Sequence, residues 1–101
     1  MIGSALPELE WTELARADLL AIVDYISDHN PDAAQRLKDD IEEKVAALPE
    51  YPRMYRSVRV EGTREMLVRA NYIVVYDVTV FTIMILRVLH AAQQWPAEPQ
   101  Q

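Results

Sequence analysis

Hydrophobic residues gather in the second half of the chain, in three runs rich in β-branched and aromatic side chains. The runs are Arg64 to Arg69, Tyr72 to Val78 and Phe81 to Leu89. Only the dipeptides Ala70-Asn71 and Thr79-Val80 separate them. Because connections this short join antiparallel neighbours, the pattern predicts three strands of a β-meander.

Two further strands are predicted outside the meander. One runs from Tyr55 to Val60 and joins the next strand through Glu61-Gly62, where glycine can adopt the positive φ that a tight turn requires. The other runs from Glu8 to Trp11, where polar and apolar residues alternate as they do in a short edge strand. The predicted sheet therefore combines the strands of the second half of the chain with one short strand near the N-terminus.

The residues between Thr12 and Pro49 carry two apolar stripes with helical spacing. The first stripe consists of Ala15, Leu19, Ile22, Val23 and Ile26, and the second of Ala34, Leu37, Ile41, Val45 and Leu48. Thr12 is a good N-cap for a helix running to about Asp28, and Asn30 with Pro31 suits the start of a second helix that Pro49 stops. So short a break predicts an antiparallel helical hairpin.

These elements predict a single α+β domain over residues 1–101, in two layers: the N-terminal strand and the helical hairpin pack on an antiparallel β-sheet meander. Residues 1–7 are expected to be frayed. Residues 91–101 are polar and broken by proline, which predicts a tail with one large apolar anchor at Trp95.

If all three turns of the sheet are two-residue loops, the register follows, and both faces of the sheet are apolar. One predicted face holds Met66, Val68, Ile73, Val75, Met84, Leu86 and Val88, and the other holds Val58, Val60, Leu67, Val74, Tyr76, Ile83 and Ile85. A helical hairpin covers only one face. The tail, another copy or a different protein must cover the second face, and a partner protein is the preferred interpretation.

The same register places Arg59 directly opposite Arg64, with Asp77 across from Arg64 on the next strand. Like charges facing each other cost energy unless an anion lies between them. The pattern therefore indicates either an ordinary Arg64–Asp77 salt bridge or a two-arginine site for a carboxylate or phosphate. Arg87 lies inside an apolar strand, where it either packs its aliphatic stem or pairs with Glu65 or with a carboxylate of a partner.

The formal net charge is −6, whereas proteins that hold nucleic acid by its phosphates normally carry a basic excess. We therefore expect no direct sequence-specific nucleic-acid binding. Twelve of the sixteen acidic residues lie in residues 1–50, while residues 51–101 carry six arginines and four acidic residues. The helical half is acidic and the sheet half basic.

Residues that carry chemistry are sparse. The absence of cysteine excludes disulfides and thiolate nucleophiles and fits a reducing cytoplasm, and with only His29 and His90, far apart, we expect no metal and no cofactor. No nucleophile–base pair, phosphate-binding glycine loop or carboxylate dyad is present, so His90 is only a weak candidate for a general acid or base. The longest apolar run, Val78 to Leu86, is too short to span a bilayer.

Four motifs follow one another along nearly the whole chain. They are W-T-x-x-A-x-x-D-L-x-x-I-x-x-Y-I (Trp11 to Ile26), Y-P-R-M-Y-R-S-V-R-V-E-G-T-R-E-M-L-V (Tyr51 to Val68), N-Y-I-V-V-Y (Asn71 to Tyr76) and I-L-R-V-L-H-A-A-Q-Q-W-P (Ile85 to Pro96). In this order and spacing they resemble the ParE/RelE superfamily of toxins from bacterial type II toxin–antitoxin operons. The resemblance implies the fold predicted above, a ParD-like antitoxin whose C-terminal segment covers the remaining sheet surface, and a toxin–antitoxin hetero-oligomer.

The superfamily has two mechanisms, and this chain departs from one of them. RelE-like members cut mRNA in the ribosome with cationic residues, one of which lies where this chain has Ile73. Another lies just after the last strand, often followed by a catalytic tyrosine, whereas this chain has His90-Ala91-Ala92-Gln93-Gln94-Trp95. The departures favour the ParE-like branch, which poisons DNA gyrase and is not expected to be an enzyme.

The sequence thus predicts a cytoplasmic ParE-like gyrase poison neutralised by its antitoxin. RelE-like mRNA cleavage is the alternative, and a non-toxic interaction domain is a minor one. The residues predicted to bind the antitoxin or the target are Arg59, Arg64, Arg69, Arg87, His90 and Trp95.

Overall fold

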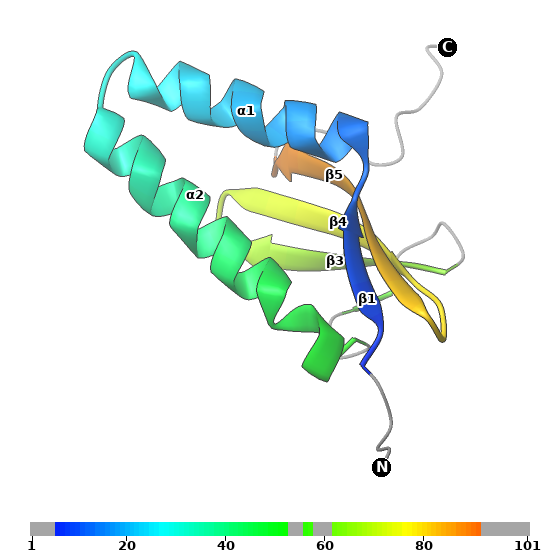
Figure 1. Ribbon diagram of the computed structural model, residues 1–101. Coiled ribbons are helices and arrows are strands. Elements are labelled where there is room, and N and C mark those ends of the chain that lie inside the picture. The colour runs from blue at the N-terminus through cyan, green and yellow to red at the C-terminus, as the bar shows by residue number, and fades with distance from the viewer. Residues whose placement is uncertain (1–5, 53–55, 58–61, 92–101) are drawn as a thin grey trace, which may run out of the picture.

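Two helices cover one face of a five-stranded sheet in the computed structural model, which describes residues 6–52, 56–57 and 62–91 (Figure 1). The helices are α1 (Glu13–Ser27) and α2 (Pro31–Ala46), followed by a 3-10 turn, η1 (Leu48–Glu50). The strands are β1 (Glu8–Trp11), β2 (Arg56–Ser57), β3 (Thr63–Val68), β4 (Tyr72–Val78) and β5 (Thr82–His90). This is the two-layer α+β fold that the sequence predicts.

The sheet is mixed rather than wholly antiparallel. Its strand order is β1-β5-β4-β3-β2, and β1 pairs in parallel with β5 at one edge, from Glu8 opposite Thr82 to Trp11 opposite Ile85. The other pairs are antiparallel. Parallel pairing is possible here because the whole helical hairpin and the meander lie between β1 and β5 in the chain, which is far more than a tight turn.

The helix boundaries follow from capping chemistry. The Thr12 hydroxyl accepts a hydrogen bond from the Ala15 N–H at 3.0 Å, and the Asn30 side chain accepts one from the Ala33 N–H at 3.0 Å. Pro31 occupies the first turn of α2, where its missing N–H costs nothing. α2 ends at Ala46, slightly before the predicted Leu48, because the chain tightens into η1 ahead of its proline.

The core lies between the helical hairpin and the inner face of the sheet. Both predicted apolar stripes reach it, since Ala15 and Leu19 of α1 and Leu37, Ile41 and Val45 of α2 are buried there. Burying each such leucine, isoleucine or valine contributes about 1.5–3 kcal/mol. The hairpin is therefore held by its apolar face rather than by helix propensity.

The pairing at all three connections differs from the pairing predicted for two-residue turns. Val68 pairs with Tyr72, so the β3–β4 loop has three residues, and Arg69 takes a φ of 54° within it. Val78 pairs with Ile83 across the β4–β5 loop, and Ser57 rather than Arg59 pairs with Arg64. The predicted register is therefore wrong at every turn.

A slip of one residue exchanges the two faces of a strand, so the predicted faces are also wrong. The residues that share the helix-facing core come from both predicted sets: Met66, Val68, Val74, Tyr76, Ile83, Ile85 and Val88. On the opposite face Leu67 is 54% exposed, whereas Val75 and Leu89 are buried. A single chain thus buries part of the second face, which leaves less apolar area for a partner than predicted.

Candidate functional site

The described arginines that were predicted to bind a partner do not gather at one site. Arg64 lies on β3 opposite Ser57 and Tyr76, and Asp77 lies opposite Thr63. Both predicted cross-strand partners of Arg64, namely Arg59 and Asp77, are therefore wrong, because the pairing of β3 with β2 and with β4 is shifted from the predicted register. Arg59 itself and Trp95 lie outside the described residues.

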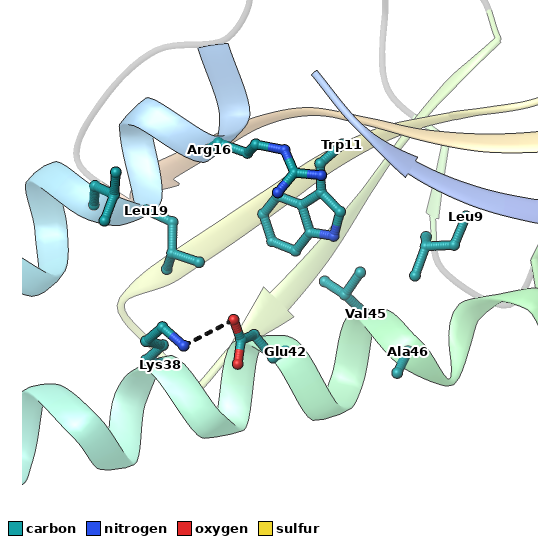
Figure 2. Close-up of a pocket in the computed structure, with 9 residues that line it drawn as sticks. Leu9, Trp11, Arg16, Leu19, Lys38, Glu42, Val45 and Ala46 are labelled. Carbon is teal, nitrogen blue, oxygen red and sulfur yellow. Dashed lines mark ion pairs between the residues drawn. The ribbon is translucent and has the colours of Figure 1, made fainter. Parts of the chain in front are cut away.

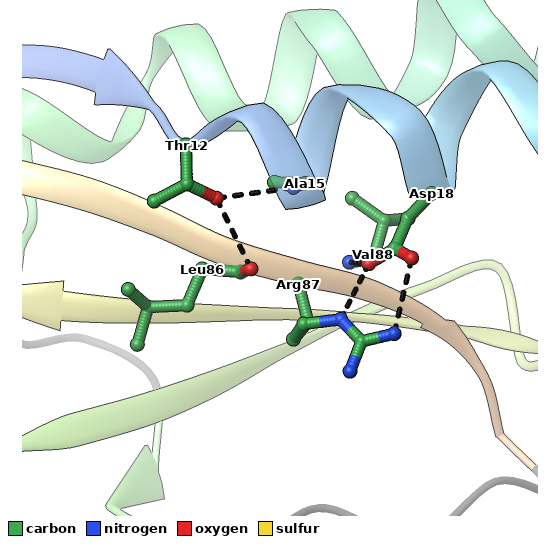
Figure 3. Close-up of polar contacts among 6 residues, drawn as sticks. All are labelled: Thr12, Ala15, Asp18, Leu86, Arg87 and Val88. Atoms are coloured by element: carbon green, nitrogen blue, oxygen red, sulfur yellow. Dashed lines mark hydrogen bonds and ion pairs between the residues drawn. The ribbon is translucent and has the colours of Figure 1, made fainter.

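Arg87 is held by a carboxylate of α1 (Figure 3). Its Nε and Nη2 donate to the two oxygens of Asp18 at 2.7 and 3.1 Å, and the side chains are 25% and 14% exposed. The hydrogen bond from Arg87 to Asp18 raises the pKa of Arg87, against the opposing effect of partial burial. The carboxylate in this pair belongs to Asp18 of the helical layer, which was not among the options that the sequence suggested, namely a packed stem, Glu65 or a carboxylate of a partner.

The same part of α1 also provides hydrogen-bond partners for backbone groups at the edge of β5, beyond the point where β1 ends (Figure 3). The Thr12 N–H donates to the Ile85 carbonyl at 3.0 Å, and the Thr12 hydroxyl donates to the Leu86 carbonyl at 3.2 Å. The Val88 N–H then donates to Asp18 at 3.0 Å. Two side chains of the α1 region therefore replace the missing neighbour strand.

A β-bulge in β5 makes this arrangement possible. Tyr76 pairs with Ile85 and Val75 pairs with Arg87, so Leu86 is the extra residue. Ile85 and Val88 consequently both join the helix-facing core, although strict alternation would place residues three apart on opposite faces. An arginine inside an apolar strand was the sequence signal for a buried partner, but the bulge that directs it could not be read from alternation.

Two of the remaining predicted residues lie at the ends of strands. Arg69 pairs with Asp40 of α2, with 2.6 Å between Nε and Oδ2, and both side chains are more than 40% exposed. His90 is exposed at the end of β5, where its ring meets Tyr72 edge-on at 5.4 Å between centroids. These two rings and α1 border a shallow pocket of about 320 Å³. Among the residues described, no three acidic, histidine or cysteine side chains are placed to hold a metal ion.

An open groove of about 480 Å³ lies between β1, α1 and α2 (Figure 2). Its apolar lining consists of Leu9, Trp11, Leu19, Leu20, Val45 and Ala46. Arg16, Lys38 and Glu42 add charges of both signs, with Lys38 and Glu42 paired at 3.0 Å. Leu20 is 60% exposed beside it. Nothing in the sequence indicated this groove, because Leu9 and Trp11 pack against the core and only their partial exposure in the folded chain shows that they also line a surface.

The groove is suited to protein recognition. Its walls are apolar and open, which fits the side chains of a peptide segment, and its charges are dispersed rather than convergent on one point.

No described helix is long and apolar enough to cross a membrane.

The helical hairpin on a meander sheet, with a parallel strand at its edge, defines the ParE/RelE class of toxin fold. A solved chain of the chromosomal ParDE toxin–antitoxin system of Pseudomonas aeruginosa superposes with a TM-score of 0.78 at 30% identity, over 86% of this chain and 98% of that one. RelBE2 of Mycobacterium tuberculosis (TM-score 0.57, 22% identity, 90% and 98% covered) and HP0894 of Helicobacter pylori (0.56, 13%, 88% and 98%) share the fold.

Sequence comparison agrees. Residues 9–95 match the model of the ParE toxin of type II toxin–antitoxin systems. The chain is 42% identical to Y4kP of Sinorhizobium fredii, named as a suspected toxin, over 87% of this chain and 92% of that protein. It is 37% identical to toxin RelE2 of Caulobacter vibrioides over 85% of this chain and 97% of that one. The chain therefore belongs to the ParE toxin family of type II toxin–antitoxin systems.

Proposed function

We propose that the chain inhibits growth by poisoning DNA gyrase, and that its cognate antitoxin neutralises it by binding along the groove between β1, α1 and α2. The observation that carries the proposal is the family match over residues 9–95, together with the 30% identical chain of a ParDE system. The protein acts by binding, as the ParE-like branch does, and the complex is a toxin–antitoxin hetero-oligomer in the cytoplasm.

The groove has the chemistry that an antitoxin segment needs. An amphipathic helix recognised in a groove presents apolar residues at i, i+3, i+4 and i+7, and the lining here is apolar over two helices and a strand. Leu20 is 60% exposed and lines the groove, and half-buried Trp11 faces the same space (Figure 2). Both side chains leave apolar surface in contact with water unless a partner covers it. Burying such a leucine contributes about 1.5–3 kcal/mol to a complex.

The charges at the groove favour a segment that carries both signs. Arg16 attracts a carboxylate of the partner, while the Lys38–Glu42 pair offers one donor and one acceptor group. Arg64 and His90 remain predicted contacts of the antitoxin or the target. Arg69 and Arg87 can serve a partner only in competition with Asp40 and Asp18.

Gyrase poisoning is preferred to mRNA cleavage because of where cations lie. In-line attack on a phosphate needs a base, an acid and cations aimed at the developing charge. Ile73 occupies the position where the RelE-like branch places a cation, and the guanidinium groups of Arg69 and Arg87 are directed to carboxylates of the helices. The similarity to toxin RelE2 favours ribosome-dependent mRNA cleavage as the second candidate.

One experiment separates the two. Supercoiling by purified gyrase is measured with the toxin, with the toxin plus its antitoxin, and without either, while mRNA on programmed ribosomes is examined by primer extension. We expect loss of supercoiling that the antitoxin restores, and no codon-positioned cuts. Normal supercoiling together with cuts that disappear in His90→Ala would replace the gyrase proposal with the alternative.

A further inference from the structure

The loop between β4 and β5 is fixed by one threonine. The Thr79 hydroxyl accepts hydrogen bonds from the N–H groups of Phe81 and Thr82 at 3.2 and 2.9 Å. The Thr79 N–H donates to the Thr82 carbonyl at 2.9 Å, and the two threonine hydroxyls lie 3.0 Å apart. The turn is therefore closed by side-chain and backbone bonds within four residues.

The two residues between these threonines are the most exposed large apolar side chains described. Val80 is 79% exposed and Phe81 is 78% exposed. Turn centres usually carry Gly, Asn, Asp or Ser, because these residues supply turn geometry or local hydrogen bonds. Here Thr79 supplies the bonds, so neither the turn nor the core accounts for a valine and a phenylalanine at this position.

We propose that Val80 and Phe81 form an apolar prong that inserts into an apolar pocket on the protein that the toxin inhibits. The inference rests on the proposed function, in that the chain is a toxin acting on a protein target. A prong held by a closed turn loses little conformational entropy on binding, and a phenylalanine in a partner's pocket is the kind of anchor that dominates interface energies.

The negative charge next to the prong indicates which kind of partner pocket would receive it. The N–H of Glu8 donates to the Phe81 carbonyl at 2.8 Å, which places this exposed glutamate beside the prong. A carboxylate there disfavours stacking on nucleic acid, because phosphates would be repelled. It favours a protein pocket with a basic rim.

Neither Val80 nor Phe81 lines the groove assigned to the antitoxin, although Leu9, which follows Glu8, does. The groove lies on the helix side of the sheet, whereas the β4–β5 loop projects from the far end of its strands, away from the helices (Figure 1). A second copy is the weaker occupant, since each copy carries a net charge of −6 and a glutamate beside the prong.

The double variant Val80→Thr/Phe81→Ser is compared with the control Leu14→Ser. The control removes an exposed apolar side chain (53% exposed) from α1, outside the prong. Growth inhibition on induction, the concentration that halves gyrase supercoiling, antitoxin Kd, Tm and molecular mass are measured for both. We expect inhibition to fall at least about tenfold in the double variant alone, with Kd within about twofold of the wild type. Phe81→Leu, which keeps an apolar anchor, should retain most of the inhibition.

The outcomes separate this inference from the proposed function. If the wild type is toxic and the double variant is equally toxic, the proposed role of the prong is overturned. If the double variant loses antitoxin affinity but keeps full toxicity, the prong binds the antitoxin and the proposal is overturned. If the wild type is a dimer and the double variant a monomer, the prong binds a second copy and the proposal is likewise overturned. If the double variant is unfolded, Phe81→Ala and Phe81→Leu decide the question by their difference in toxicity. A toxic wild type that leaves gyrase unaffected overturns the gyrase proposal, while growth inhibition still tests the prong; a non-toxic wild type overturns both.

Discussion

Asp18 of α1 and Arg87 of β5, 69 residues apart in the sequence, form two hydrogen bonds of 2.7 and 3.1 Å (Figure 3). Asp18 also accepts the Val88 N–H at 3.0 Å. One carboxylate thus satisfies a guanidinium and a backbone donor at the edge of the sheet. It fixes α1 against β5 where β1 no longer covers that edge.

Asp18→Asn should lower the free energy of unfolding by about 1–3 kcal/mol, because it weakens charge-assisted bonds to a partly buried guanidinium. Urea unfolding measures the change. Asp40→Asn is the matched control, since the same substitution in the exposed pair with Arg69 should cost at most about 1 kcal/mol. Equal losses in the two variants would show that the Asp18 bonds contribute no more than a surface pair.

The Asp18–Arg87 coupling should be independent of pH across the neutral range. Asp18 raises the pKa of Arg87 above an already high ordinary value. A basic group with a raised pKa contributes stability that is complete below its unfolded pKa and is lost only as the pH rises through the folded pKa. Double-mutant cycles with Asp18→Asn and Arg87→Gln at about pH 6 and about pH 9 should therefore give the same coupling energy within error. A large fall by pH 9 would contradict this assignment.

Arg69 adopts a left-handed backbone conformation, with φ at 54°. Arg69→Gly should be nearly neutral for stability, because relief of about 1 kcal/mol of backbone strain offsets the loss of an exposed ion pair. Arg69→Val loses the same ion pair but places a β-branched residue in that conformation, so it should be less stable than Arg69→Gly by about 1–2 kcal/mol. Urea unfolding of both variants checks this, and a more stable valine variant would contradict it.

Antitoxin affinity should depend on Leu20 and not on Leu14. Both leucines are exposed on α1, at 60% and 53%, but only Leu20 lines the groove. Leu20→Glu should weaken binding of the antitoxin at least about tenfold, whereas Leu14→Glu should leave Kd within about twofold. Isothermal titration calorimetry gives both constants. Equal effects would place the antitoxin elsewhere on the surface.

Thr79 should contribute to stability beyond what an exposed residue normally does. Thr79→Ala removes two acceptor contacts to N–H groups, and we expect a loss of about 1–2 kcal/mol. Thr79→Ser keeps the hydroxyl and should recover most of the loss. Thermal unfolding of the three proteins distinguishes these cases, and an unchanged Tm in Thr79→Ala would mean that the turn is closed by backbone bonds alone.

The sequence by itself determined the elements and the fold class. The stripes of α1 and α2, the caps at Thr12 and Asn30, and the bounds of β4 follow from local rules, because capping and periodicity act within a few residues. Local signals of this kind survive folding. They identify two helices against a sheet before any long-range contact is known.

Only the tertiary structure decided register, strand direction and pairing across the layers. The strands of the meander carry apolar residues on both faces, so alternation could not exclude a slip of one residue, and the real turn lengths set the pairing. The parallel β1–β5 pair, the Asp18–Arg87 bonds and the groove at Leu20 join residues far apart in the chain. Such contacts depend on how α1 packs along β5, which no local pattern specifies.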